Sequence, residues 1–311
     1  MNSMKAMCVE GNPPSSLVEK DLPVPQPGPD EILVRVHAAG VTPTEMLWYP
    51  TTHAQSGEPR LEAVPAHEFS GTIAALGSQA SGFSLGQEIY GLNDWFSEGA
   101  AAEYCLTQSS LIAPKPARLS HAEAAGVPIS ALTAWQGLFN KAQLRAGERV
   151  LIHGAAGAVG LFAVQWAKRA GAFVVTTSSA KDGEFLKELG ADQVIDYRRE
   201  RFEERAGEVD VIFDGVGGET LARSWAILSA KGRLVTIAAS GEEARDERSK
   251  AAFFIVEPSQ DQLMETARLL DQGDLKTFTR GVIPLAQASS AYFNPSASSD
   301  RRGKQVIAIA D

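Results

Sequence analysis

The chain has 311 residues, of which 44% are hydrophobic and 22% charged, and its formal net charge is −9. This length favours two globular domains whose cores need no disulfide support. The acidic balance argues against a chain-wide nucleic-acid surface, and no apolar run reaches the roughly 20 residues that a membrane span needs. The first 16 residues have no long apolar core, so we expect no secretory signal. Cys8 and Cys105 form no close-spaced metal pattern, and we expect reduced thiols in a cytoplasmic protein.

The region up to about residue 120 has a strand-like pattern of short apolar runs separated by Gly, Pro and Ser clusters. The proline-rich stretch 22–30 excludes a helix, because proline removes backbone donors and its ring clashes with the preceding turn. The sequence therefore predicts a strand-rich, partly barrel-like domain. Its strands are expected at 31–40, 69–77, 87–92 and 101–107.

The hydrophobic period changes from Ser120 onward. Ser120 and Glu123 form a capping box that predicts a short helix, and a second helix is expected at 130–142. Apolar strands then alternate with helices, which is typical of a doubly wound parallel sheet. The expected strands are 149–153, 172–177, 193–196, 209–213, 232–238 and 252–256, and the expected helices are 158–170, 181–189 and 217–228.

The carboxy-terminal part contains one more helix and one more strand. Ser259 and Gln262 form another possible capping box, and Gly273 ends the helix that they begin. The tail 303–311 is predicted to form a last strand that returns to the first domain.

The turn after the strand at 149–153 has the spacing Ala155-x-Gly157-x-x-Gly160, without the first glycine of the dinucleotide fingerprint. Gly157 would let the backbone approach a pyrophosphate, and Gly160 would let the helix pack closely on the strand. The first amides of that helix would face the phosphates. Ala155 can replace glycine if its φ is negative. The pattern indicates a nucleotide site, and the alternative is a plain strand–helix corner.

The second strand of this unit ends without the acidic residue that NAD enzymes usually place at its tip. The tip carries Thr177, Ser178 and Ser179, followed by Lys181, and Tyr197 lies just past the third strand. Hydroxyls and an ammonium would bind a 2′-phosphate, which a carboxylate would repel. These residues predict NADP, as NADPH, as the cofactor. The alternative for Lys181 alone is a solvated lysine at a helix start.

Segments spread over nearly the whole chain carry a family resemblance. They include "VPAHEFSGTIAALG" (64–77), "HGAAGAVGLFAVQWAKRAGA" (153–172), "LKELGADQVIDYR" (186–198), "FDGVGGETL" (213–221) and "RGKQVIAI" (302–309). The chain resembles the zinc-independent quinone oxidoreductase, or zeta-crystallin-like, branch of the medium-chain dehydrogenase/reductase superfamily. The resemblance implies an α/β protein with a GroES-like β-rich catalytic domain at 1–120 and 275–311 and a Rossmann NADP-binding domain at 121–274. It also implies an active site in the cleft between these domains.

The resemblance also implies which residues contact the cofactor. Gly157, Ala158 and Val159 would take the pyrophosphate, and Ser178, Lys181 and Tyr197 would surround the 2′-phosphate. The remaining expected contacts are Val216 at the adenosine half, and Thr133, Phe254 and Gly303 near the nicotinamide.

Zinc-dependent members of this superfamily carry a cysteine near the position of Thr44, a histidine in Gly-His-Glu and a further ligand near Ile129. This chain has His67 and Glu68, but neither Thr44 nor Ile129 can supply a soft metal ligand. No metal is therefore expected, and a hydrogen-bonded structural His67 is favoured over residual metal binding. Many zinc-free members carry Asp where this chain has Glu45.

The reaction follows from the expected lack of a metal Lewis acid. A quinone or an α,β-unsaturated carbonyl accepts a hydride more readily than a plain ketone, because it delocalises the added electrons. Thr42 and Tyr49 are candidate donors to the developing oxygen charge, with Trp48 as an apolar wall. The alternative for each is a packing role. The predicted function is NADPH-dependent reduction of a quinone or enone, and the alternatives are a non-catalytic, crystallin-like NADPH-binding protein and a zinc alcohol dehydrogenase.

Assembly is predicted from the apolar stretch 251–258, which contains the expected sixth strand. In the strand order 3-2-1-4-5-6 this strand lies at an edge, and an exposed apolar edge favours pairing with a second copy. The family resemblance also implies such a homodimer. The alternative is that the last helix or the carboxy-terminal segment covers the edge.

Overall fold

A computed structural model of the protein describes residues 3–238, 246–294 and 302–309, and its backbone forms two compact units. The first unit comprises Met1–Ile129 and Pro258–Asp311, and the second comprises Ser130–Glu257. This division groups the helices α2 (His121–Ala125) and α10 (Gln260–Gln272) with the first unit, whereas the expected boundaries assigned both to the second.

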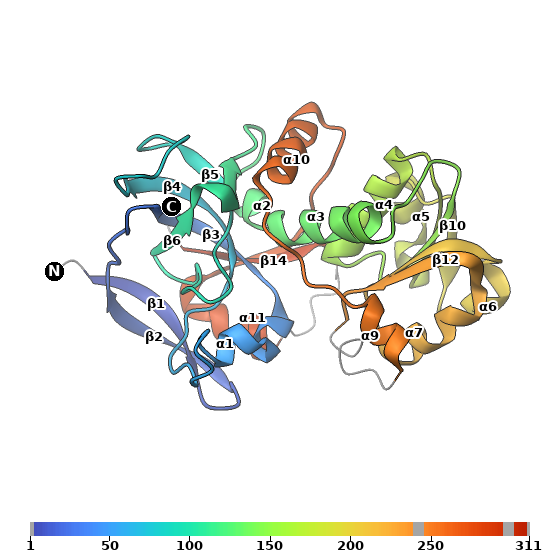
Figure 1. Ribbon diagram of the computed structural model, residues 1–311, viewed down its shortest axis with the longest axis horizontal. Helices are drawn as coiled ribbons and strands as arrows, with labels where there is room; N and C mark the ends of the chain where they lie inside the picture. The colour runs from blue at the N-terminus through green and yellow to red at the C-terminus, as the bar shows by residue number, and fades with distance from the viewer. Residues whose placement is uncertain (1–2, 239–245, 295–301, 310–311) are drawn as a thin grey trace. The chain divides into compact units, whose positions relative to one another are not determined.

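The first unit is a largely antiparallel sheet centred on β3 (Figure 1). One side of β3 pairs with β4, and the other side is shared by β6 and β14. The main sheet has the order β13-β14-β3-β4-β5-β7, and β1 and β2 form a separate hairpin. The strands are β1 (Ser3–Glu10), β2 (Ser16–Pro23), β3 (Glu31–Val41), β4 (Glu68–Leu76), β5 (Glu88–Leu92), β6 (Tyr104–Gln108), β7 (Ile112–Pro114), β13 (Thr279–Pro284) and β14 (Lys304–Ala308).

The four strands expected before residue 120 are confirmed as β3, β4, β5 and β6, and the expected tail strand is confirmed as β14. The hairpin β1–β2 and the strands β7 and β13 were not expected. β1 buries four consecutive residues, Ala6–Val9, and so lacks the alternation that marks a half-buried strand. Pairing with β2 makes it a strand, and a local pattern does not reveal that pairing.

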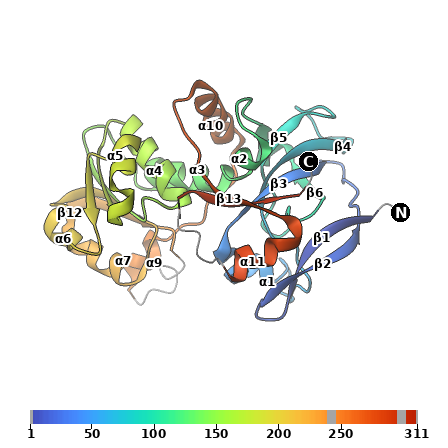
Figure 2. The same cartoon turned by 180° about the vertical axis from the view of Figure 1, so that it is seen from behind.

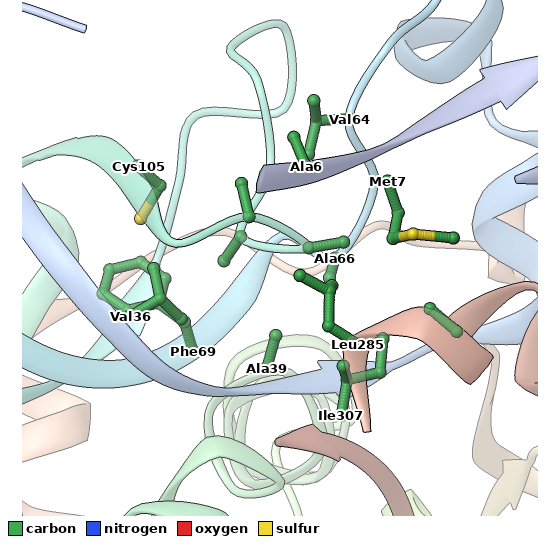
Figure 3. Packing of buried hydrophobic residues seen from close by; sticks show 14 of the residues in the cluster. Ala6, Met7, Val36, Ala39, Val64, Ala66, Phe69, Cys105, Leu285 and Ile307 are labelled. Carbon is green, nitrogen blue, oxygen red and sulfur yellow. The ribbon is translucent and has the colours of Figure 1, made fainter. Parts of the chain in front are cut away.

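The core of the first unit lies among β1, β3, β4, β6 and β14 (Figure 3). Each fully buried Val, Leu, Ile, Phe or Met side chain there contributes roughly 1.5–3 kcal/mol of burial energy, and each alanine methyl contributes roughly 0.8 kcal/mol. The labelled members are Ala6, Met7, Val36, Ala39, Val64, Ala66, Phe69, Cys105, Leu285 and Ile307.

Short helices complete the first unit around the end of β3. The 3-10 helix η1 (Pro43–Leu47) follows β3 directly, and α1 (Tyr49–Thr52) comes next. Helix α11 (Ala288–Phe293) packs against both η1 and β2 (Figure 2). The Ser289 hydroxyl of α11 accepts a hydrogen bond of 2.9 Å from the Leu17 amide of β2. This hydrogen bond ties α11 to β2, and Tyr292 of α11 is buried.

The second unit is a five-stranded parallel sheet with the order β10-β9-β8-β11-β12. In chain order this is 3-2-1-4-5, as expected for the first five strands. Its core includes Leu151, Val175, Ile195 and Ile212, and α4 and α5 lie side by side (Figure 1). The elements are β8 (Arg149–His153), α4 (Ala158–Arg169), β9 (Phe173–Ser178), η4 (Ala180–Asp182), α5 (Gly183–Leu189), β10 (Gln193–Asp196), α6 (Phe202–Arg205), β11 (Val209–Asp214), α7 (Gly218–Ser224), η5 (Trp225–Ile227), β12 (Leu228–Thr236) and α9 (Glu247–Ala252).

The sixth strand expected at 252–256 is wrong. Ala252 is the last residue of α9, a helix that Asp246 caps by accepting from the Ser249 amide at 3.0 Å. Phe253 then makes a single parallel bridge to Thr236 of β12. The amide of Glu257 donates to the Gln136 side chain instead of to a neighbouring strand. The Phe254 amide does donate to the Thr236 carbonyl oxygen at 3.2 Å, but the pairing does not continue into a ladder along the described residues.

The expected helix boundaries are largely confirmed. Ser120 and Glu123 form a complete capping box at α2, and Ser259 caps α10, which ends at Gly273 in the left-handed conformation. The helix expected at 130–142 is α3 (Pro128–Trp135) followed by a π-helical turn, η3 (Gln136–Lys141). Among the described residues, no helix has the length and apolar character needed to cross a bilayer.

Candidate functional site

The turn between β8 and α4 explains why the first glycine of the dinucleotide fingerprint can be absent. Gly154, the residue directly after β8, has a φ of 73°, so this position takes the left-handed conformation that favours glycine. Ala155 is fully buried and does not adopt a positive φ. The sharp change of direction therefore occurs one residue earlier than the pattern Ala155-x-Gly157-x-x-Gly160 suggests, and alanine is tolerated.

The two later glycines of the turn have different surroundings. A Cβ on Gly160 would lie 2.3 Å from the Gly154 carbonyl oxygen and 2.6 Å from Ala155 Cα. A Cβ on Gly157, whose φ is −78°, would meet only the Gly154 oxygen, at 3.2 Å. Gly160 is therefore needed for helix–strand packing, while Gly157 at the helix start leaves the backbone open to a ligand.

The position of this turn in the sheet is that of a ligand site. β8 is the central strand, with β9 on one side and β11 on the other, so the strand order reverses at its carboxyl end. Ligands of open parallel sheets bind in the crevice at such a point. The first amides of the twelve-residue helix α4 lack intrahelical acceptors, and they carry the positive end of its dipole.

The loop after β11 lies over the same turn. Buried Asp214 accepts hydrogen bonds from the amides of Val216 and Gly217 at 3.0 and 3.1 Å, and this holds the loop in place. Val216 is 53% exposed, and its Cγ2 would lie 3.4 Å from a Cβ on Gly154. The exposed apolar side chain of Val216 thus lies beside the turn that begins at Gly154.

The last residues of β9 and β10 pair with each other in the parallel sheet. Asp196 pairs with Ser178, and the Tyr197 amide donates to the Ser178 carbonyl at 3.2 Å. Ser178 is buried, Lys181 is exposed, and Tyr197 is 56% exposed. The exposed Arg198 guanidinium lies 5.7 Å from the Tyr197 ring centroid, and so adds a cation that the sequence reasoning missed.

An acidic group does lie close behind the tip of β9. The Ser179 hydroxyl donates to the buried Asp182 carboxylate at 2.7 Å. Asp182 belongs to η4 and not to the end of β9, where an NAD-type carboxylate would be expected. The carboxylate is therefore used to hold the turn between β9 and α5.

The three residues expected near the nicotinamide lie in different environments. Thr133 is buried in α3. Phe254 is also buried, and its ring lies against Gly137, where a Cβ would meet Phe254 Cζ at 3.0 Å. Gly303 has a φ of 78° and faces Phe278, whose carbonyl oxygen would be 1.9 Å from a Cβ. Packing alone requires glycine at 303, and contact with a cofactor stays a prediction for all three.

A buried polar network occupies the first unit beside η1. The Glu45 carboxylate accepts from the Ala66 amide at 2.9 Å, contacts His67 Nδ1 at 2.5 Å and accepts from the Tyr292 hydroxyl at 3.2 Å. His67 Nε2 lies 3.2 Å from the Ser97 carbonyl oxygen. Burial raises the pKa of the Tyr292 hydroxyl well above its usual range, so it stays a donor. Both ring nitrogens of His67 are thus engaged by oxygen atoms.

A second network joins the ends of three neighbouring strands. The Lys304 ammonium forms an ion pair with Glu68 and donates to the Thr42 hydroxyl at 2.7 Å. The other Glu68 oxygen accepts from the Ile129 amide at 2.9 Å. Glu68 is fully buried and Lys304 is 6% exposed. Burial raises the pKa of the Glu68 carboxyl, and the nearby ammonium of Lys304 acts in the opposite direction.

The three candidate catalytic residues surround η1. Thr42 precedes this helix and is half-buried, while Trp48 and Tyr49 follow it. The Trp48 ring meets Trp95 edge-on at 5.5 Å, and the exposed Tyr49 ring stacks on His53 at 4.4 Å. The structure brings these residues to one region of the first unit, and their contact with a substrate stays a prediction.

Comparisons with known proteins agree with this architecture. Residues 28–117 match the family described as alcohol dehydrogenase GroES-like domain, and residues 189–307 match zinc-binding dehydrogenase. A probable zinc-binding oxidoreductase of Arthroderma benhamiae is 32% identical over 96% of this chain and 94% of its own length. The mouse quinone oxidoreductase is 30% identical over 96% of this chain and 95% of its length.

The chain belongs to the quinone oxidoreductase branch of the medium-chain dehydrogenase/reductase superfamily. The solved structure of the quinone oxidoreductase from Coxiella burnetii superimposes on this member with a TM-score of 0.88, at 27% identity and 99% coverage of both chains. The protein is therefore an oxidoreductase that uses a nicotinamide cofactor. The turn at Gly154–Gly160 fits such a cofactor, because its glycines leave the backbone and the helix start accessible.

The name of one matching family implies a bound zinc ion, but the residues of this chain do not fit such an ion. His67 is engaged at both nitrogens, and Glu68 is paired with Lys304. Within 3–238, 246–294 and 302–309, no group of three His, Cys, Asp or Glu side chains could hold a metal ion. The Lys304 ammonium thus pairs with the carboxylate of Glu68, the residue that follows His67.

Sequence reasoning missed Lys304 and Tyr292 in these networks. Lys304 is 262 residues from Thr42, and Tyr292 is 247 residues from Glu45. The basic run 198–201 after the third strand was a local signal for Arg198. No comparable local signal marks the two long-range partners.

Proposed function

We propose that this protein is an NADPH-dependent reductase that transfers a hydride to a quinone or another α,β-unsaturated carbonyl compound. The observation that carries the proposal is the network of Glu68, Lys304 and Thr42. It offers hydrogen-bond donors and a positive charge beside His67 and Ile129, two of the positions at which zinc-dependent members of the superfamily carry metal ligands. The names of the relatives from mouse and Coxiella burnetii point to the same class of acceptor.

A conjugated acceptor suits such a site better than a plain ketone. When bound, the reduced nicotinamide supplies a hydride. A quinone or enone spreads the added electron pair onto its oxygen, so hydrogen-bond donors suffice to stabilise the product anion. In this proposal, the Thr42 hydroxyl and the Tyr49 phenol are the donors, and Trp48 is an apolar wall for the acceptor ring.

The choice of NADPH is supported by the tip of β9. Tyr197 follows β10 directly, and its amide donates to the Ser178 carbonyl at the end of β9. Lys181 and Arg198 are exposed residues that follow β9 and β10 and add positive charge. In this proposal, Gly157, Ala158 and Val159 hold the pyrophosphate at the start of α4.

Cofactor choice is tested by equilibrium titration. NADPH should bind at least about tenfold more tightly than NADH, because the lost phosphate contacts are worth roughly 1.5–3 kcal/mol. Lys181→Ala should weaken NADPH and leave NADH nearly unchanged. Lys187→Ala is the matched control, because Lys187 is an exposed lysine of α5 that pairs with Glu184. Equal affinities for the two cofactors would refute the assignment.

The reaction is tested by NADPH oxidation against a panel of quinones, enals and enones, with and without prolonged chelation. We expect turnover of at least one conjugated acceptor that survives chelation. Tight NADPH binding without turnover of any acceptor would instead favour a non-catalytic binding protein. Loss of activity on chelation, restored by zinc alone, would favour a zinc alcohol dehydrogenase.

A homodimer in the cytoplasm completes the proposal. The edge strand β12 bridges the following segment only at Phe253, and Ile255 of that segment is 62% exposed. Light scattering at micromolar concentration should give about twice the chain mass of 33.1 kDa. A monomeric mass would refute the dimer, and Ile255→Lys should shift the mass toward the monomer if this edge forms the interface.

Cys8 and Cys105 are buried free thiols, which suits a reducing compartment.

A further inference from the structure

We propose that Lys304 polarises and positions the Thr42 hydroxyl, so that this hydroxyl donates a strong hydrogen bond to the acceptor oxygen that gains charge during reduction. Glu68 is the counter-ion that holds Lys304 in place. The inference rests on the proposed reduction of a conjugated carbonyl compound, and it names the residues that would stabilise the charged oxygen. Thr42 is the group that touches the substrate, and Lys304 is a positioning residue.

The sheet register brings these residues together. Gln305 of β14 pairs with Val41 of β3, so Lys304 faces Thr42 at the next position of the antiparallel pair. Phe69 of β4 pairs with Ala39 of β3, so Glu68 faces Gly40. The ammonium and the carboxylate therefore reach the end of β3 from its two neighbouring strands.

Two glycines make room for the ion pair. A Cβ on Gly40 would lie 2.6 Å from Glu68 Oε1 and 2.7 Å from the Ala125 carbonyl oxygen. A Cβ on Gly126 would lie 3.0 Å from Lys304 Cβ. Because Lys304 is only 6% exposed and its stem packs on Gly126, the ammonium is held in one position. Such pre-organisation costs no rearrangement when charge develops nearby.

The Thr42 hydroxyl has the right hydrogen-bond state for donation. Thr42 occupies the residue before η1, but its side chain does not cap that helix, and its oxygen accepts from Lys304 at 2.7 Å instead. A hydroxyl that accepts from an ammonium keeps its own proton for another acceptor, and the charge strengthens that second bond. Thr42 is half-buried, so this proton can reach a bound molecule.

The chemistry requires no proton transfer from Thr42. When the acceptor carbon gains a hydride from the bound nicotinamide, the electron pair of the conjugated system moves onto the oxygen. The Thr42 O–H donates to that oxygen while the negative charge develops. A solvent proton then neutralises the enolate or quinolate, so atoms and charges balance.

A double-mutant cycle on kcat tests the coupling. The variants are Thr42→Val, the pair Lys304→Met with Glu68→Gln, and all three changes together. Removing both buried charges avoids leaving an unpaired buried carboxylate, and the side-chain oxygen introduced by Glu68→Gln can still accept from the Ile129 amide. Thr42→Ser, which keeps a hydroxyl, should restore most of the kcat that Thr42→Val loses, and Thr44→Val, at an exposed threonine of η1, is the matched control.

We expect Thr42→Val to lower kcat by about 100-fold, the lower end of what loss of an oxyanion donor costs. In the Lys304→Met, Glu68→Gln background the same change should cost less than about threefold. NADPH affinity should stay unchanged in every variant. Additive effects in the cycle would mean that Lys304 acts only on structure, and would overturn the inference. Absence of turnover in the wild-type protein would count against the proposed function instead.

A binding measurement provides a readout without turnover, and it serves if the double variant does not fold. The probe is 4-nitrophenol, whose phenolate absorbs visibly. The wild-type protein and Thr42→Ser should bind the phenolate about tenfold more tightly than the neutral phenol, because a charge-assisted donor favours the anion. Thr42→Val should lose that preference. Equal binding of phenol and phenolate by the wild-type protein would refute the polarised donor.

Discussion

The two glycines of the turn before α4 give a sharp test of how this site is built. Gly160→Ala would place a Cβ 2.3 Å from the Gly154 carbonyl oxygen and 2.6 Å from Ala155 Cα. Both are backbone atoms, so no side chain can move away. Since ordinary contacts of a Cβ begin at 3.4 Å, the helix must shift outward by about 1 Å or the turn must open.

The expected cost follows from this overlap. Overpacking of a well-packed core costs roughly 1–3 kcal/mol, and alanine recovers up to about 1 kcal/mol as a better helix former than glycine. The net expectation is a loss of about 1–2 kcal/mol in the free energy of unfolding. Gly157→Ala meets only one atom, at 3.2 Å, and has an ordinary φ of −78°. That variant should change stability by less than about 0.5 kcal/mol.

Urea unfolding, followed by tryptophan fluorescence, measures both variants under the same conditions. Cofactor titration is the second measurement. Gly157→Ala should weaken NADPH binding while the urea midpoint stays near that of the wild-type protein. The reasoning fails if Gly160→Ala is as stable as wild type, or if Gly157→Ala is the more destabilised of the two.

Three further predictions concern stability. Burial lowers the pKa of His121 and of His153 to about 4, so the unfolded chain binds protons below about pH 6.5 that the folded chain does not. The urea midpoint should therefore fall as the pH drops from about 6.5 toward 4, and a midpoint that rises would contradict this sign. Ala66→Gly should leave the melting temperature nearly unchanged, because relief of its left-handed φ of 71°, worth about 1–2 kcal/mol, is offset by the lost burial of a methyl group and by the added chain entropy of glycine; a clear fall in the melting temperature would argue against backbone strain there. Gly40→Ala should lower the melting temperature clearly, since a Cβ would lie 2.6 Å from Glu68 Oε1, and a soluble variant that melts like wild type would show that the ion pair can relocate.

Much of the second unit could be predicted from the sequence. Strands buried on both faces are continuous apolar runs, as at 149–153 and 209–213, and helices between them carry their own caps and periodicity. The turn at 154–160 is also local, because the need for glycine there arises from contacts within seven consecutive residues. The same reasoning failed at 252–256, where the apolar run is short and Asp246 caps a helix that ends inside it.

The networks of the first unit were decided by tertiary structure. His67, Glu68, Thr42 and Glu45 could be singled out from the sequence, but Lys304 and Tyr292, which complete the networks, could not. Lys304 reaches Thr42 because β14 pairs with β3 in one particular register, and Tyr292 reaches Glu45 because α11 packs against η1. Local patterns record whether a residue lies in a strand and which face it buries, whereas register between distant strands depends on the packing of the whole unit. The sequence by itself thus determined the strand–turn–helix that fits a nucleotide, and the tertiary structure alone set a lysine ammonium against the carboxylate and hydroxyl at the end of β3.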